Sequence, residues 1–406
     1  MPRLPLLPLL VVASGLPGCA RVPAESAWLD APVAVPAPAA AGSRFPRLAQ
    51  DAAGHPVMSW LEPDGPAVAL RYARWRDDGW SPARTVARGT DWFVNWADFP
   101  SVVTDGQGHW AAHWLEQVPG DGYAYGVRLA TSGDGGTWSA PWTPHGDGTP
   151  TEHGFVSLLP WHGGFVAVWL DGRHTGGSHD QGDGNAGGMT LRSATIDASG
   201  RQAGPDVELD GLTCDCCQTG AALAATGPVV VYRDRGADGT RDISIVRLEA
   251  GHWSAPAPVA RDGWAIDACP VNGPAVDADG NTIVVAWFTG AGGARVRVAF
   301  SRDSGRHFDA PVDVDTGRVE GRVDVALLED GRAVVSWLRG AGDTASLLAR
   351  PYTTDGPAGR AVEVTRADAS RAGGFPQVAR AGEALVFAWT ESGPAPALRT
   401  VTARLR

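Results

Sequence analysis

The cysteine residues of this sequence are spaced closely enough to bind a metal ion or to form disulfides. Five occur in 406 residues, and three of them, Cys214, Cys216 and Cys217, lie within the segment GLTCDCCQTG. With Cys269, these thiols could hold a soft ion such as Cu(I) or Zn(II), although zinc sites usually space their ligands as C-x2-C. In an oxidising compartment four cysteines favour disulfides, but a bond between adjacent residues would be strained. The pattern leaves open disulfides alone, a metal site, and one disulfide beside a labile redox pair.

Arginine, carboxylate and tryptophan side chains form the second group. Arginine can grip a carboxylate ligand through two charge-assisted bonds, and carboxylic acids can transfer protons. These side chains gather in segments that precede or follow apolar strands, at a density that turns do not require. The candidates that these segments supply for a binding or catalytic site are Trp96, Asp98, Glu152, Arg173, Arg233, Arg235, Arg322 and Asp324.

An internal repeat determines where both groups lie. An apolar stretch, a glycine turn and a second apolar strand ending in an aromatic residue recur seven times, 50 to 63 residues apart. Two further strand-like segments follow each aromatic residue, so the sequence predicts an all-β propeller of seven four-stranded blades. The last unit lacks its outer strand, and the segment APVAV (31–35) is expected to supply it and close the ring. The seven aromatic residues, which we expect to pack between blades, are Trp60, Trp114, Trp169, Tyr232, Trp287, Trp337 and Trp389.

Propeller topology gathers the chemical residues on one face. The loop that precedes each first strand and the loop that follows each second strand lie at the same end of a blade, around a central funnel. Cys214 and Cys269 each lie 18 residues before the aromatic residue of their repeat. We therefore expect the loop with three cysteines to face Cys269 on the adjacent blade.

The net charge and the N-terminal sequence indicate which partners are disfavoured and where the protein is located. The formal net charge is −11, which disfavours nucleic acid and anionic membrane surfaces as partners. Residues 1–19 predict a signal peptide that ends in LPGC, similar to a bacterial lipobox with Cys19 as the lipidated residue. Residues 20–43 are rich in Ala and Pro and predict a tether, and residues 44–406 form the propeller. We expect an exported, monomeric lipoprotein of the periplasm or cell envelope, held at the membrane through its lipid only.

Two turn motifs connect the repeat to a known family. The segment SRDSGRHF (301–308) matches S-x-D-x-G-x-x-[WF], the Asp box, and TSGDGGTW (131–138) is a near copy. The chain resembles the sialidase (BNR or Asp-box repeat) β-propeller superfamily over residues 44–406. The motifs CDCCQTG, YRDR, CPVNGP and GRVDV, in this order, are similar to bacterial exported sialidase-like proteins. Because sialidases usually have six blades, a six-bladed propeller is the alternative fold.

The resemblance also implies a chemistry. Sialidases grip a sugar carboxylate with arginines, protonate the leaving group with a carboxylic acid and use a tyrosine as nucleophile. Asp98 lies about where the family keeps its acid/base residue, Glu152 is a second catalytic candidate, and Arg44 is a shifted counterpart of the early family arginine. The leading hypothesis is a propeller that recognises, and if active hydrolyses, a glycan or small-molecule ligand at the funnel. Whether the chain is an enzyme stays open, because a metal- or thiol-handling propeller and a protein-binding scaffold are alternatives.

Overall fold

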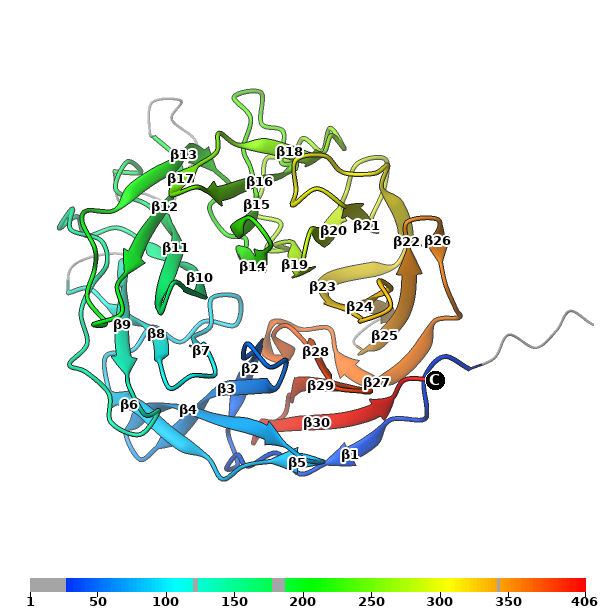
Figure 1. Ribbon diagram of the computed structural model, residues 1–406, viewed down its shortest axis with the longest axis horizontal. Helices are drawn as coiled ribbons and strands as arrows, with labels where there is room; N and C mark the ends of the chain where they lie inside the picture. The colour runs from blue at the N-terminus through cyan, green and yellow to red at the C-terminus, as the bar shows by residue number, and fades with distance from the viewer. Residues whose placement is uncertain (1–26, 120–122, 177–186, 342–343) are drawn as a thin grey trace, which may run out of the picture.

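The computed structural model is a ring of seven antiparallel sheets around a central axis (Figure 1). It describes residues 27–119, 123–176, 187–341 and 344–406. The prediction of a seven-bladed, all-β propeller is confirmed, and the six-bladed alternative is wrong. The predicted signal peptide and Cys19 lie outside the described residues and stay predictions. Within the described part of the chain, no helix has the length and apolar character needed to cross a membrane.

The first three blades differ in their outer strands. Two short strands, β5 and β6, pair with β4 in the first blade, and the second blade has three strands, with Trp142 bridging to Leu129 at its outer edge. The strands of the first blade are β2 (Arg44–Gln50), β3 (Pro56–Asp64), β4 (Ala67–Arg76), β5 (Gly79–Trp80) and β6 (Arg84–Gly89). Those of the second and third blades are β7 (Ser101–Thr104), β8 (Trp110–Gln117), β9 (Tyr125–Ser132), β10 (His153–Trp161), β11 (Gly164–Asp171), β12 (Met189–Ile196) and β13 (Val207–Thr213).

Each of the other four blades has four or five antiparallel strands. The fourth and fifth blades contain β14 (Gly220–Ala224), β15 (Gly227–Arg233), β16 (Ile243–Glu249), β17 (His252–Trp253), β18 (Ala257–Ala260), β19 (Ala275–Asp279), β20 (Thr282–Thr289), β21 (Arg295–Ser301) and β22 (Val312–Thr316). The sixth and seventh contain β23 (Val319–Leu327), β24 (Ala333–Ala341), β25 (Thr344–Thr353), β26 (Gly356–Pro357), β27 (Val362–Asp368), β28 (Gln377–Ala381), β29 (Ala384–Glu391), β30 (Ala397–Arg404) and β1 (Val33–Val35). A 3-10 turn, η1 (Arg371–Gly373), joins these last two blades.

The two ends of the chain meet in the seventh blade. Strand β1 pairs antiparallel with β30, Val33 opposite Thr402, which confirms that residues 31–35 supply the missing outer strand. Before β1, Trp28 is 5% exposed, and its indole N–H donates to the Arg360 carbonyl at 2.8 Å. The ordered propeller therefore begins inside the range 20–43 that was predicted as a tether, because Trp28 buries its ring against the last two blades.

The aromatic residues of the repeat are buried as expected, although each second strand continues one to four residues past its aromatic residue. In five blades the indole N–H of this Trp donates to a carboxylate of the same or the preceding blade, as Trp169 does to Asp171 at 2.9 Å. The bond satisfies the one polar atom of an otherwise apolar ring. The other four pairs are Trp60 with Glu62, Trp114 with Glu116, Trp287 with Asp262, and Trp337 with Asp315.

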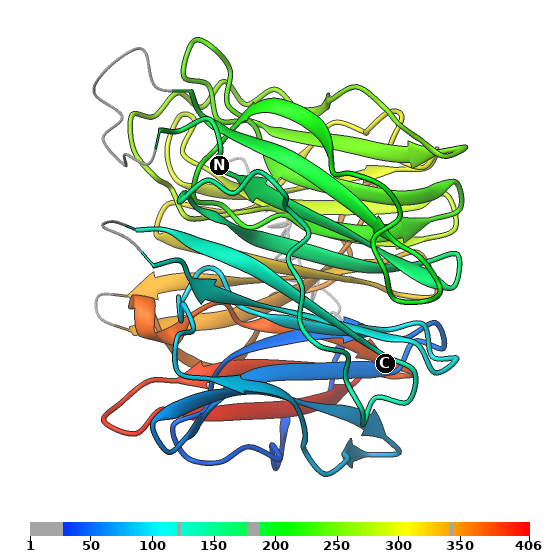
Figure 2. The ribbon, with the colours of Figure 1, turned by 90° about the vertical axis from the view of Figure 1, so that its left-hand side faces the viewer.

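In the turns with Asp-box sequences, the Asp and Ser side chains accept hydrogen bonds from backbone N–H groups. In the turn after β21, the Asp303 carboxylate accepts a hydrogen bond from the His307 N–H at 2.9 Å, and the Ser301 oxygen accepts one from the Gly305 N–H at 2.9 Å. Asp134 accepts from the Gly136 and Thr137 amides in the turn after β9, both at 2.7 Å. Both turns join third to outer strands, at the face opposite the funnel loops (Figure 2).

We predict that Trp28→Ala lowers the free energy of unfolding by about 3 kcal/mol, because it removes a buried aromatic ring and leaves a cavity between the last two blades. Urea denaturation followed by circular dichroism measures this change. Val33→Ala is the matched control, since the Val33 side chain is 63% exposed and its loss should change stability little. Equal stability of wild type and Trp28→Ala would contradict the assignment of this segment to the propeller.

Candidate functional site

The loops with the predicted chemistry lie at one end of the blades. In the third blade His153, which begins β10, pairs with Asp171, which ends β11, and Met189, which begins β12, pairs with Thr213, which ends β13. The loop before a first strand, the loop after a second strand and the end of the outer strand therefore share one face of the ring. We call this face the rim. The first strands themselves surround the central axis (Figure 1).

Asp98, Tyr125 and Glu152 form a compact group at the rim, the acid cluster. Tyr125 begins β9 and pairs with Glu152, which directly precedes β10. The Tyr125 phenol donates to Asp98 Oδ2 at 3.1 Å, and the Phe155 N–H donates to Asp98 Oδ1 at 2.8 Å. Asp98 and Tyr125 are 2% and 1% exposed, whereas Glu152 is half-buried. Glu152 is thus the member of the acid cluster that a ligand can reach.

Burial raises the pKa of all three groups of the acid cluster. It raises the pKa of Asp98 to about 7. Burial, with the nearby carboxylates of Asp98 and Asp215, raises the pKa of Glu152 to about 8. Burial and the charge of Asp98 raise the pKa of Tyr125 well above its ordinary value. At neutral pH Glu152 therefore keeps its proton, which suits it to donate one rather than to accept one.

The four cysteines meet beside the acid cluster. Cys214 and Cys217 have their Sγ atoms 3.6 Å apart, and the sulfur atoms of Cys214, Cys216 and Cys217 all lie within 4.8 Å of one another. The loop that carries Cys269 faces this loop, because the Gly273 N–H donates to the Gln218 side-chain oxygen at 3.0 Å and the Cys269 and Cys216 thiols interact. We call these four residues the cysteine seam. All four are free thiols, so the predicted disulfides do not form within the described part of the chain.

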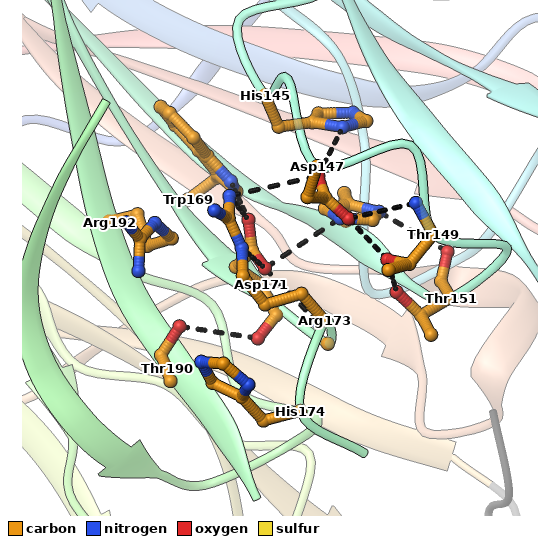
Figure 3. A network of polar contacts seen from close by, with 12 residues as sticks. His145, Asp147, Thr149, Thr151, Trp169, Asp171, Arg173, His174, Thr190 and Arg192 are labelled. Carbon is orange, nitrogen blue, oxygen red and sulfur yellow. Dashed lines mark hydrogen bonds and ion pairs between the residues drawn. The ribbon is translucent and has the colours of Figure 1, made fainter. Parts of the chain in front are cut away.

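A second polar network lies in the third blade, close to the rim (Figure 3). The His145 and His153 rings stack with centroids 3.8 Å apart, and Asp147 contacts both rings, at 3.3 Å and 3.2 Å. Asp171 receives two bonds from the Arg173 guanidinium, both 2.7 Å. Arg173 also lies 3.7 Å from Asp147, so a cation already occupies the middle of this network. Arg173 therefore holds carboxylates of its own chain rather than a ligand.

Two other predicted binding arginines are also engaged internally. Arg233 is 1% exposed and donates to the carbonyls of Asn272 and Phe288 at 2.8 Å and 2.7 Å. Arg322 is 7% exposed and donates to three backbone carbonyls between residues 369 and 374, at 2.8 to 3.0 Å. Both guanidinium groups tie rim loops together. These two guanidinium groups thus donate to carbonyls of their own chain, and their predicted role in binding an anionic sugar stays a prediction.

The remaining candidates are dispersed around the rim and the axis. Arg44 lies over the Phe45 ring at 5.8 Å, and Arg235 pairs with Asp215 at 3.6 Å. Trp96 stacks on Phe375, with centroids 5.6 Å apart, below the guanidinium of Arg322. Asp324 lines a cavity of about 40 Å³ on the axis, where its carboxylate accepts the Val378 N–H at 2.7 Å. Burial raises the pKa of Asp324 to about 6.

Sequence reasoning missed three members of the site. No sequence pattern pairs Tyr125 with a carboxylate, because its partners Asp98 and Glu152 lie 27 residues before and after it. His145 and Asp147 lie in an irregular loop with no repeat to align, so no sequence pattern marked them. The recurrence of a carboxylate two residues after the strand-ending Trp, as in Glu62 and Asp171, could have marked part of the network.

Comparisons with known proteins agree with this fold. No protein-family model and no curated protein matches the sequence. An ulvan lyase of polysaccharide lyase family PL25 is similar at 12% identity with a TM-score of 0.52, covering 92% of this chain and 94% of that one. The α-L-arabinofuranosidase Arb93A of Fusarium graminearum is 13% identical with a TM-score of 0.46, covering 93% and 97%. The Hadza microbial sialidase Hz136 is 14% identical with a TM-score of 0.44, covering 73% of this chain and 63% of its own length.

Gly154 packs so closely against Asp98 that a substitution there tests the geometry of the acid cluster. A Cβ atom at Gly154 would lie 2.0 Å from Asp98 Oδ2, so Gly154→Ala must displace this carboxylate. We expect a loss of about 1 to 3 kcal/mol in stability. Gly146→Ala is the matched control, because nothing lies within 4 Å of a Cβ at that glycine. Urea denaturation of both variants measures the difference, and equal stability would contradict the close packing of Asp98.

At 12 to 14% sequence identity, the similarity to these structures concerns the fold alone. The architecture predicted from the sequence is the one observed. This chain has the fold of an all-β propeller with seven blades, and it is similar in fold to the ulvan lyase.

Proposed function

We propose that this protein cleaves a glycosidic bond at the rim, with Glu152 as the general acid. The observation that supports this most directly is a half-buried carboxyl group with a pKa of about 8, beside Tyr125 and Asp98. Glycoside hydrolysis needs a carboxylic acid that is still protonated at the working pH, so that it can protonate the leaving oxygen. Asp98 serves as a positioning residue, because it is buried behind Tyr125 and raises the pKa of Glu152.

Aromatic side chains beside the acid cluster support a sugar as the ligand. Tyr123 is 53% exposed, and its ring meets Phe93 edge to face at 5.2 Å. Phe93 in turn stacks on Tyr125 at 4.0 Å, so the exposed ring adjoins the acid cluster. An aromatic face with a polar tip suits the apolar face and the hydroxyl groups of a sugar ring. Since Arg233 and Arg322 bind carbonyls of their own chain, the proposal does not require an anionic sugar.

Turnover of a panel of fluorogenic glycosides, sialosides included, tests the proposed activity. We expect Glu152→Gln to lower kcat/KM on the best substrate by about 10²- to 10⁴-fold, because the amide has no proton to transfer. Asp267→Asn is the matched control, since Asp267 is an exposed carboxylate two residues from Cys269 and outside the acid cluster. No turnover of any glycoside by the wild type, or full activity of Glu152→Gln, would contradict the proposal.

The pH profile follows from the direction of the Glu152 shift. An acid that must be protonated is lost as pH rises through its pKa, so activity should fall on the alkaline side near pH 8. The Tyr125 hydroxyl, whose proton goes to Asp98, also lies against Glu152 and lowers its pKa, so Tyr125→Phe should move this alkaline limb to higher pH. Rates of wild type and Tyr125→Phe between about pH 5 and 10 measure the limb. An alkaline limb that does not move in Tyr125→Phe would argue against Glu152 as its source.

A further inference from the structure

The cysteine seam is the strongest cluster of ligand atoms that the proposed activity does not use. We propose that Cys214, Cys216, Cys217 and Cys269 bind one thiophilic d10 metal ion, of the kind represented by Cu(I) and Zn(II), as thiolates. Three of the sulfur atoms come from one loop, before β14, and the fourth comes from the loop before β19 on the adjacent blade. The site would join two blades at the rim.

The spacing of the sulfur atoms fits coordination to a shared ion. Two thiolates bound at about 2.3 Å to one ion lie about 3.8 Å apart in tetrahedral geometry. The Cys214 and Cys217 sulfurs are 3.6 Å apart, and Cys216 completes a triangle within 4.8 Å. Cys216 and Cys269 interact across the two loops, which brings the fourth thiol beside this triangle. Three sulfurs can bind Cu(I) in a plane, and Cys269 supplies the fourth ligand that tetrahedral Zn(II) needs.

Buried positive charge surrounds the seam. Arg241 is 3% exposed, and its Nε and Nη1 atoms have no hydrogen-bond partner among the residues that the structure describes. Its charge acts on Cys269, and that of the buried Arg233 acts on Cys214 and Cys217. A buried guanidinium with unpaired N–H groups is costly, and thiolates would add to the compensation that the nearby Asp215 carboxylate gives Arg241. Three or four thiolates with one cation leave a net negative charge that these two arginines offset.

The backbone holds the seam ready for a ligand. The Cys214 N–H donates to the Arg233 carbonyl at 3.0 Å, and the backbone N–H of Asn272 lies near the Cys217 sulfur. Gln218 joins the two loops because its side-chain oxygen accepts the Gly273 N–H at 3.0 Å. Amide hydrogen bonds to sulfur and fixed loops are the supporting interactions that metal-binding thiolates use. Cys214 and Cys217 are each 1% exposed, whereas Cys269 is exposed and marks the side from which an ion enters.

We do not propose a metal ion at the second group of potential ligands. His145, Asp147 and His153 could also hold an ion by the distances between their ligand atoms (Figure 3). Arg173 already lies 3.7 Å from Asp147 and binds Asp171 with two bonds. A second cation at this place would meet the guanidinium. The cysteine seam has no such competing cation between its sulfur atoms in the described structure.

Metal binding to the purified full chain tests the proposal. Elemental analysis after purification, and titration of the reduced protein under anaerobic conditions, use Zn(II) and Cu(I) as separate probes, each against a chromophoric chelator. We expect about one ion per chain, with sulfur-to-metal charge-transfer absorption on substitution with Co(II). Cys216→Ser should weaken binding by more than about 100-fold, and Cys269→Ser should weaken Zn(II) more than Cu(I). The ion that copurifies with the chain identifies the metal, because relative affinity in a titration follows the ion more than the site.

Matched controls separate the site from the fold and from the proposed hydrolysis. Asp267→Asn lies two residues from Cys269, keeps all four thiols and should bind like the wild type. Glu152→Gln should also keep the metal, so loss of hydrolysis and loss of metal are measured independently. If Cys216→Ser fails to fold, Cys269→Ser replaces an exposed residue and still tests the site. Absence of uptake of both ions by the reduced wild type, or unchanged affinity in both serine variants, would overturn the proposal.

Discussion

Closure of the ring by β1 on β30 is the constraint on which the other features depend. An open propeller would leave a sheet edge exposed at the last blade, with unpaired N–H and C=O groups. Val33 to Val35 cover that edge, and Trp28 packs between the last two blades just before them. Closed blades fix the loops at the rim relative to one another. Residues that are distant in the chain, such as Cys217 and Asn272, can then meet reproducibly.

Burial at the rim has opposite consequences for carboxyl groups and for arginines. Carboxyl groups that are removed from water hold their protons more tightly, which gives Glu152 and Asp98 raised pKa values near neutrality. Arginines keep their charge and therefore need acceptors, which Arg233 and Arg322 find in backbone carbonyls. The same environment thus raises the pKa of the carboxyl groups and directs the guanidinium groups to backbone carbonyls.

Two chemically distinct groups share the rim at the boundary of neighbouring blades. The acid cluster joins the second and third blades, because Asp98 accepts the Phe155 N–H. The cysteine seam joins the fourth and fifth blades, where Gln218 bonds Gly273. Gln218 also donates to the Ala97 carbonyl at 2.6 Å, directly beside Asp98, so one side chain connects the two groups. Loops that stabilise the ring therefore also position the titratable groups.

The sequence by itself determined the blade count, the closing strand, the buried aromatic residues and the meeting of the cysteine loops. These follow from local patterns, since repeat length and alternation of apolar residues are written along the chain. Only the tertiary structure decided which rim residues are partners. It placed Tyr125 between Asp98 and Glu152, and it directed Arg233 and Arg322 into the protein. Side-chain direction and burial depend on atoms contributed by other blades, and no local pattern contains that information.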